Sequence, residues 1–214
     1  MSAEEERRPR RSRREERKEE TRAELIEAAA KVFARRGYHG ASVEQIAAEA
    51  GFSTGAVYWH FEDKEDLFLA LYEHWVGKRV VEIEAAWSKE GTLVEKARAA
   101  AEDWMQEFER TPEPFLLRLE FATQAARDQD LRAKLGTRVG AVPLAIRRLL
   151  EDRAATEGLE LRLPLDDVAL ARQALSLGLA LEALSNPDAV RPGLNGDLAA
   201  LFIELLDART SRAR

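Results

Sequence analysis

The chain of 214 residues contains no cysteine and only three histidines. Without cysteine it can form no disulfide, no thiolate nucleophile and no cysteine-based zinc site. His39, His60 and His74 are too scattered to indicate a metal cluster, and the sequence has no glycine-rich phosphate loop and no G-x-S-x-G segment. The sequence therefore predicts no metal and no cofactor, and it argues against an enzyme.

Long apolar runs are missing as well. The longest, residues 174–181 (ALSLGLAL), is much shorter than the roughly 20 residues that a membrane-spanning helix needs. The N-terminal residues are charged rather than apolar, so no signal peptide is expected. We therefore expect a cytoplasmic protein without a membrane partner.

The charge of the chain is −6, which at first argues against binding to nucleic acid. Its distribution weakens that objection, because residues 7–18 hold eight basic and only two acidic side chains. Local patches decide DNA binding, and acidic regions can lie far from the phosphates. Residues 1–20 are predicted to be a disordered charged arm, which either follows DNA or is an ordinary solvated tail.

The most informative segment is residues 42–61, SVEQIAAEAGFSTGAVYWHF, which predicts two short helices joined by a tight turn. Ser42 can cap the first helix in a capping box with Gln45. Gly51 suits the chain reversal, since glycine tolerates a positive φ, and Ser53 can cap the second helix. This is the anatomy of a helix-turn-helix, whose second helix enters the major groove of DNA. The predicted outward-facing residues of that helix are Thr54, Gly55, Ala56, Tyr58, Trp59 and His60.

The remaining chain predicts further helices and no strands. We expect helices from about Thr21 to Gly37, then at 63–87, 92–110, 115–126, 130–157 with a kink near Gly140–Pro143, 166–185 and 197–210. The fold class is all-α, with about nine helices. Residues 21–80 are predicted to form a three-helix DNA-binding domain, and residues 81–214 a larger domain for ligand binding and dimerisation.

The last two helices carry a separate signal, because residues 174–184 are apolar on nearly every side. One side can pack on its own domain, whereas the other needs a second cover. We favour a four-helix interface between two subunits over a central helix buried within one monomer. The predicted interface residues are Ala171, Ala174, Leu175, Gly178, Leu181, Leu198, Leu201, Phe202 and Leu205.

Residues 21–75 closely resemble the tetracycline-repressor (TetR) family of bacterial regulators. The resemblance rests on the three-helix arrangement, the turn positions and the segment from Tyr58 to Lys64, YWHF-x-x-K. It implies a homodimer that binds a palindromic DNA operator and is released by a small molecule. It also implies contacts from the outward-facing residues named above and phosphate contacts from Ser42 and Lys64.

Each of these residues also has a structural interpretation. Ser42 can simply cap its helix, Tyr58 or Trp59 can be half-buried packing residues, and His60 can be a structural hydrogen-bonding group. The recognition helix lacks Arg, Lys, Asn and Gln, the residues that best read bases through paired hydrogen bonds. Its specificity would then rest partly on apolar contact, DNA shape or the basic arm.

The resemblance places an effector pocket among the helices between about Trp87 and Leu184. Candidate lining residues, for a largely apolar ligand, are Trp104, Met105, Phe108, Phe115, Arg118 and Phe121. Aromatic residues at helical spacing belong to a plain core more often than to a pocket. Arg118 and Glu120 point to different sides of their helix, so at most one of them would face a cavity.

The leading prediction is a dimeric transcriptional repressor released by a small effector. The alternative is a helical ligand-binding or adaptor protein whose helix-turn-helix is vestigial. Formation of a sequence-specific DNA complex separates the two.

Overall fold

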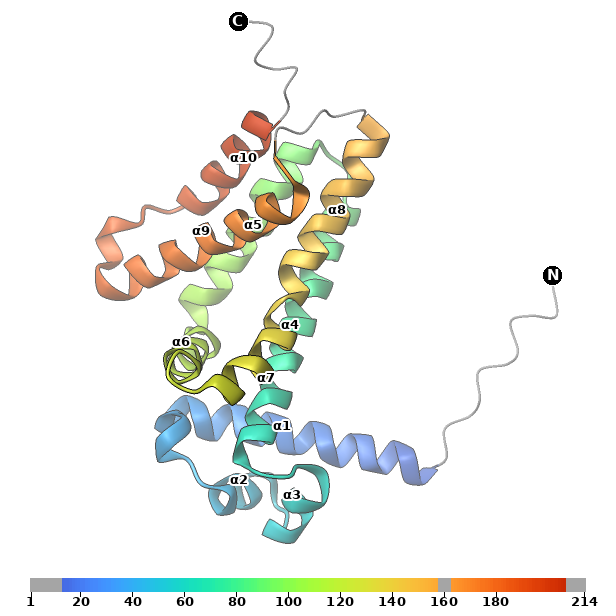
Figure 1. Ribbon diagram of the computed structural model, residues 1–214, viewed down its shortest axis with the longest axis vertical. Coiled ribbons are helices and arrows are strands. Elements are labelled where there is room, and N and C mark those ends of the chain that lie inside the picture. The colour runs from blue at the N-terminus through green and yellow to red at the C-terminus, as the bar shows by residue number, and fades with distance from the viewer. Residues whose placement is uncertain (1–12, 158–162, 207–214) are drawn as a thin grey trace, which may run out of the picture. The chain divides into compact units, whose positions relative to one another are not determined.

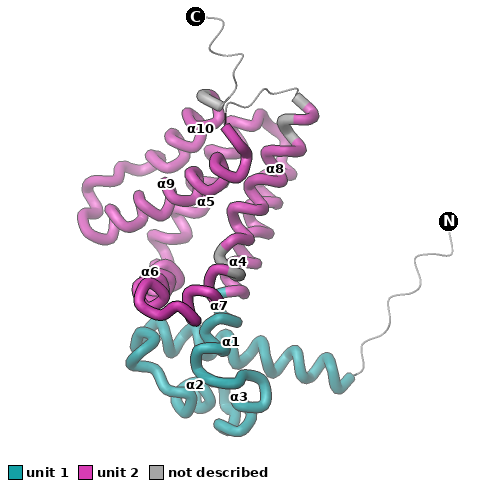
Figure 2. The backbone as a smooth tube through the Cα atoms, in the orientation of Figure 1, with its two compact units in different colours: residues 1–72 teal, residues 73–214 magenta. Residues whose placement is uncertain are grey.

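The computed structural model describes residues 13–157 and 163–206, without the side chains of residues 137–139, 153–154, 205 and 206. The regular structure of these residues is helical throughout, with ten α-helices and one short 3-10 helix (Figure 1), which confirms the predicted fold class. The helices form two compact units, unit 1 up to Tyr72 and unit 2 from Glu73 (Figure 2). The division lies within α4 (Lys64–Ser88), whereas the sequence had suggested a boundary after residue 80.

Unit 1 contains α1 (Arg13–Gly40), α2 (Val43–Ala50), α3 (Thr54–His60) and the start of α4. Apolar side chains from all four helices are buried together because each helix presents one apolar stripe. They include Leu25, Phe33, Ile46, Val57, Leu67, Phe68 and Leu71. The rings of Phe33 and Phe68 meet edge to face, with centroids 5.5 Å apart, and hold α1 against α4.

Helix α1 begins earlier than predicted. Residues 13–20 are helical, so the expectation of disorder is wrong for this part of the arm, and residues 1–12 lie outside the described residues. Arg, Lys and Glu are good helix formers, and an adjoining helix removes the cost of nucleation. At the other end, the regular helix is broken at Gly37, which has φ 68°, as predicted.

Unit 2 continues from α4 through six further α-helices. They are α5 (Leu93–Arg110), α6 (Glu113–Ala125), α7 (Gln129–Val139), α8 (Ala141–Glu157), α9 (Leu165–Ser185) and α10 (Leu194–Leu206), and the 3-10 helix η1 (Pro187–Ala189) precedes α10. The helix predicted at 130–157 is divided at Gly140, where the kink was expected. Helix α10 packs on α5 and α8 packs on α9 around a core that includes Ile83, Ala97, Leu150, Val168 and Ile203.

Helix α9 is apolar, but the rest of the chain buries only a small part of its surface. By length and composition alone, it is the one helix of the described segments that could cross a membrane, although only 17% of its apolar window is buried. The sequence prediction had weighed only the run 174–181, whereas the helix spans Leu165–Ser185. An apolar helix left open in this way needs a further partner.

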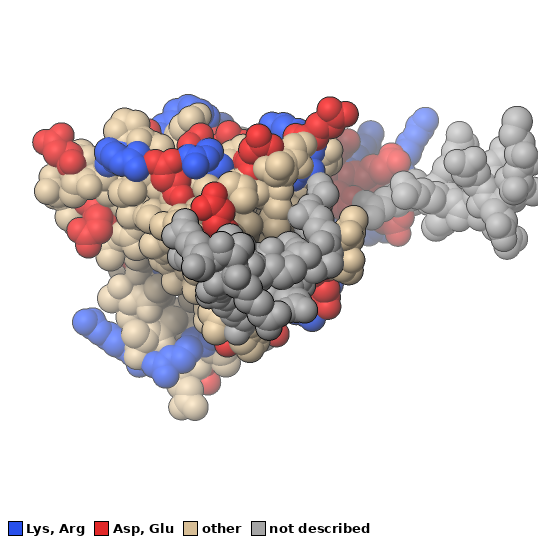
Figure 3. Space-filling model, turned by 90° about the horizontal axis from the view of Figure 1, so that it is seen from above, with Lys and Arg blue, Asp and Glu red and all other residues tan. Residues whose placement is uncertain are grey.

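Charges on the surface are mixed. In the face drawn in Figure 3, basic and acidic side chains lie beside one another rather than in separate fields. The net charge of the chain therefore describes this face poorly, and local contacts determine how the candidate site interacts with charged groups.

Candidate functional site

The first element of the site is the start of α2. The hydroxyl of Ser42 accepts a hydrogen bond from the backbone N–H of Gln45 at 3.3 Å, and the backbone N–H of Ser42 donates to Gln45 Oε1 at 3.1 Å. The predicted capping box is therefore confirmed. It fixes the entry of the chain into α2 and leaves Ser42 partly exposed at a helix N-terminus, the positive end of the helix dipole.

The turn between α2 and α3 is set by Gly51, which has φ 75° as predicted. Phe52 then donates its backbone N–H to the carbonyl of Ala47 at 2.9 Å, which closes the helix end. The hydroxyl of Ser53 accepts from the N–H of Ala56 at 3.2 Å and caps α3, again as predicted. Val57 is buried, so it fixes the rotation of α3 and determines which residues face outward.

The outward face of α3 carries two large exposed rings. The side chains of Tyr58 and Trp59 are 54% and 59% exposed, which is unusual for aromatic residues of a stable core. Gly55 is exposed beside them, while Thr54, Ala56 and His60 are half-buried. The interpretation of Tyr58 and Trp59 as packing residues does not fit this exposure, and both rings remain available to a partner.

His60 lies beside the start of α1. Its Nδ1 atom is buried and has no hydrogen-bond partner among the described residues. The ammonium of Lys18 lies 4.9 Å from the centroid of the Trp59 ring, and the guanidinium of Arg22 lies 5.1 Å from that of Phe61. Burial lowers the pKa of His60, and the charges of Lys18 and Arg22 lower it further. His60 is therefore neutral near pH 7, and basic side chains of α1 border the outward face of α3.

Lys64 has a role that the sequence did not reveal. Its ammonium donates to the carbonyls of Tyr38 and Ala41, both at 2.9 Å, and lies 4.5 Å from the centroid of the Tyr38 ring. Both carbonyls belong to the segment after the break at Gly37. Lys64 thus ties α4 to the connection between α1 and α2, and two of its three N–H donors are used within unit 1.

The candidate ligand residues come together only in part. Met105, Phe108 and Phe115 are buried in one cluster with Ala180, and Trp104 packs against it. The rings of Trp104 and Phe108 are stacked, with centroids 6.0 Å apart. Phe121 is buried and Arg118 is partly exposed, but neither belongs to this cluster.

The candidate interface residues lie mostly on the uncovered side of the last two helices. Two large apolar side chains, Leu181 and Leu201, are exposed. The small residues Ala171, Ala174 and Gly178 are exposed as well. Leu175, Leu198 and Phe202 are half-buried, and the side chain of Leu205 lies outside the described residues. The exposed positions on α9 follow a spacing of three or four residues, so they form one continuous stripe.

Three polar residues of unit 2 were missed by the sequence reasoning. They are Arg79 on α4, Arg172 on α9 and Asn195 on α10. Arg79 and Asn195 donate to backbone carbonyls of α5, and Arg172 donates to Asn195, which is 2% exposed. The available signal was a charged side chain, Arg172, within an otherwise apolar helix. Burying a charged side chain costs free energy unless the charge is hydrogen-bonded and paired.

A capped pair of short helices with an exposed aromatic second helix has the geometry of a helix-turn-helix motif. Residues 25–71 match the sequence model of the bacterial regulatory proteins of the tetR family. The chain therefore resembles this family over the helices of unit 1.

Two relatives and one solved structure illustrate the similarity. The HTH-type transcriptional repressor AcnR of Corynebacterium glutamicum is 37% identical over 119 residues, which are 53% of this chain and 55% of that protein. The chain thus matches about half the length of this relative. The HTH-type transcriptional activator FasR of Mycolicibacterium smegmatis is 29% identical over 84% of this chain and 74% of its own. The transcriptional regulator FadR of Bacillus subtilis, in complex with stearoyl-CoA, shares the fold with a TM-score of 0.69 at 20% identity, over 87% of this chain and 97% of that chain.

Proposed function

We propose that the chain binds a palindromic DNA operator as a homodimer, through α3 in the major groove, and that a small effector releases it. The exposure of Tyr58 and Trp59 carries this proposal, because each of these two large rings on a short, capped helix leaves more than half of its surface open to a partner. A tyrosine hydroxyl can bond a phosphate while its ring lies on a sugar or a thymine methyl group. Thr54, Gly55, Ala56 and His60 complete the contact face.

The two phosphate contacts implied by the resemblance are proposed in different forms. Ser42 and the free N–H groups at the start of α2 would hold a phosphate directly. Lys64 would act mainly as a positioning residue, since it fixes the connection that leads into α2.

The basic residues at the start of α1 extend the proposed surface. Lys18 contacts Trp59, so the helical residues 13–18 adjoin α3 and bring Arg13, Arg14 and Arg17 into the same region of unit 1. These exposed charges would bind phosphates and supply the electrostatic grip that the nearly chargeless α3 lacks.

Dimerisation is proposed through the uncovered faces of α9 and α10. Two copies of this stripe would cover each other in a four-helix interface, which explains the apolar character of α9 without a membrane. The small residues Ala171, Ala174 and Gly178 would allow a close approach. Dimerisation also gives the geometry for an operator, since two recognition helices about 34–36 Å apart reach successive major grooves.

Release by an effector is proposed to act through α4, which begins in unit 1 and continues into unit 2. A ligand against Trp104, Met105, Phe108 and Phe115 would favour one arrangement of α4 over another. The names of the relatives include both a repressor and an activator, and we propose repression because operator release is the simpler consequence of such a shift. A cytoplasmic location follows from this function.

A gel-shift experiment tests the proposal with DNA from upstream of the gene. The wild-type chain should form a sequence-specific complex, and the variant Tyr58→Ala/Trp59→Ala should lose it. Both positions are exposed, so the variant should keep its fold and its dimeric state. Val81→Ala, which shortens another exposed apolar side chain in unit 2, is the matched control. A folded dimer without any specific complex would favour the adaptor with a vestigial helix-turn-helix.

A further inference from the structure

Arg172 lies on the inner side of α9, opposite the exposed stripe, and its partners are all neutral. Its guanidinium donates to Ser176 Oγ at 2.8 Å and to Asn195 Oδ1 at 3.0 Å. Asn195 in turn donates from Nδ2 to the carbonyl of Ala101 on α5 at 2.8 Å. This network holds the guanidinium in a defined position between α9, α10 and α5.

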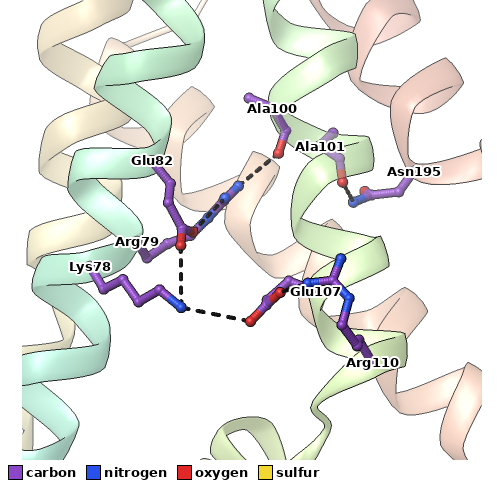
Figure 4. Close-up of polar contacts among 8 residues, drawn as sticks. All are labelled: Lys78, Arg79, Glu82, Ala100, Ala101, Glu107, Arg110 and Asn195. Atoms are coloured by element: carbon purple, nitrogen blue, oxygen red, sulfur yellow. Dashed lines mark hydrogen bonds and ion pairs between the residues drawn. The ribbon is translucent and has the colours of Figure 1, made fainter.

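A second guanidinium points toward the same helix from α4. Arg79, whose side chain is 18% exposed, donates to the carbonyl of Ala100 at 2.8 Å and makes a longer contact with Glu82 at 3.4 Å (Figure 4). Ala100 and Ala101 are consecutive, so Arg79 directly and Arg172 through Asn195 are both connected to one turn of α5. Burial lowers the pKa of Arg172, and repulsion by the nearby charge of Arg79 lowers it further, to about 10.

The positive charge of Arg172 has no carboxylate partner in the part of the chain that the structure describes. Across the described residues, no carboxylate forms an ion pair with Arg172, whereas Arg79 is compensated by Glu82, which also pairs with Lys78, and by the charge of Asp103. Each guanidinium has five N–H donors, and the contacts above use two of them on each arginine. Two partly buried guanidinium groups with spare donors, one of them without a carboxylate partner in the described segments, form a place where an anion is stabilised.

The apolar cluster begins next to this charge. On α5, Ala101 is followed one turn later by Met105 and two turns later by Phe108. On α9, Ser176 is followed one turn later by Ala180 of the same cluster. The aromatic cluster therefore lies one to two turns along α5 and α9 from Ala101 and Ser176, two residues of the hydrogen-bond network of Arg172.

We propose that Arg79 and Arg172 form an anion-binding subsite for an amphiphilic effector. The effector places a carboxylate or a phosphate between the two guanidinium groups, and its apolar part lies against Trp104, Met105 and Phe108. This assignment deepens the proposed regulator and rests on it for its biological meaning. Because α9 also carries the proposed interface, an anion held by Arg172 acts on the helix that sets the dimer geometry.

Binding of matched head groups to the full chain tests the subsite. The probes are decanoate, decyl phosphate and the neutral 1-decanol, titrated by calorimetry. The wild-type chain should bind at least one of the anions about 10- to 100-fold more tightly than the alcohol, as charge-assisted hydrogen bonds would give. The ratio of decanoate to decyl phosphate affinity then identifies the head group.

Variants locate the preference. Arg172→Met and Arg79→Met should each remove most of it while keeping the affinity for 1-decanol, and Arg110→Met, at an arginine that is 68% exposed, should leave it unchanged. If Arg172→Met does not fold, Arg172→Gln keeps a donor for Asn195 without the charge. Equal affinity of the wild-type chain for all three probes, no anion binding at all, or a preference that survives in both variants would overturn the subsite.

The same preparations separate the subsite from the proposed function. A wild-type chain that shifts operator DNA but shows no preference for anions refutes the subsite alone. A chain that prefers anions but shifts no DNA refutes the proposed regulator and leaves the subsite standing.

Discussion

Lys64→Met tests the positioning role of Lys64 in unit 1. The substitution removes two charge-assisted hydrogen bonds to the carbonyls of Tyr38 and Ala41 and the contact with the Tyr38 ring. Such hydrogen bonds contribute about 1.5 kcal/mol each, and an exposed cation–π contact about 0.5 kcal/mol. Water replaces part of this because the site is only partly buried, and the methionine keeps most of the apolar stem. We expect unit 1 to lose about 2 kcal/mol of its free energy of unfolding.

The loss should be confined to unit 1, so amide hydrogen exchange is the appropriate assay, because it resolves local from global opening. Exchange of the amides in α1 and α2 should become faster in Lys64→Met, while α5 and α10 should be unaffected. Lys89→Met removes the same charge from an exposed position of unit 2 and should change neither region.

The salt dependence of DNA binding supplies the result that would refute this reasoning. A direct phosphate contact contributes about 0.9 to the slope of log affinity against log salt for each subunit. Lys64→Met should weaken operator binding but leave that slope unchanged. Unchanged hydrogen exchange together with a slope reduced by about 0.9 per subunit would mean that Lys64 binds phosphate and not the two carbonyls.

Three further predictions concern other parts of the molecule. Gly178→Leu should weaken the dimer without unfolding the monomer, because a Cβ at this position meets nothing within 4 Å in its own chain; analytical ultracentrifugation should show dissociation, and Gly77→Leu, at an equally open glycine of α4, should stay dimeric. Gly55→Ala should raise the melting temperature slightly, since alanine favours the helix by about 0.5–1 kcal/mol and its Cβ would lie 3.8 Å from Ser53 Oγ, but it should weaken operator binding; unaltered affinity would place Gly55 away from the DNA. The lowered pKa of His60 means that unit 1 has its full stability above the unfolded pKa of about 6.5 and loses part of it as the pH falls below that value; urea unfolding from pH 7 to pH 5 should show this loss, and His60→Gln should reduce it.

The local features of the site could be predicted from the sequence because their causes lie within a few residues. Ser42 and Gln45 are three positions apart. Gly51 has a positive φ, which glycine adopts without strain. The start of α1 was missed since composition alone does not show that a charged segment continues an existing helix. The internal contacts of Lys64 were not predicted for a different reason. Its partners lie 26 and 23 residues earlier in the chain, and only the packing of α4 against α1 brings them together.

The environment of Arg172 shows the same limit more sharply. Its position in an apolar helix could be read from the sequence, but its meaning depends on α4, α5 and α10, which supply Arg79, the carbonyl of Ala101 and Asn195. A sequence pattern describes one helix at a time, whereas the balance of buried charge belongs to the whole group of helices.

Helix α9 combines two features that are unfavourable in a helix that only supports the fold. Its outer side is apolar and open, and its inner side holds a charge without a matching carboxylate among the described residues. Each feature lowers the stability of the isolated chain: the first exposes apolar surface, and the second leaves a guanidinium short of compensation. Under the two proposals above, partners would relieve both costs: a second copy on the outer side and an anionic effector on the inner side. Because the two partners meet one helix, binding of either one changes the free energy of binding the other whenever α9 shifts between them, and this coupling is reciprocal. Under these proposals, α9 is the element through which an effector would change the dimer geometry.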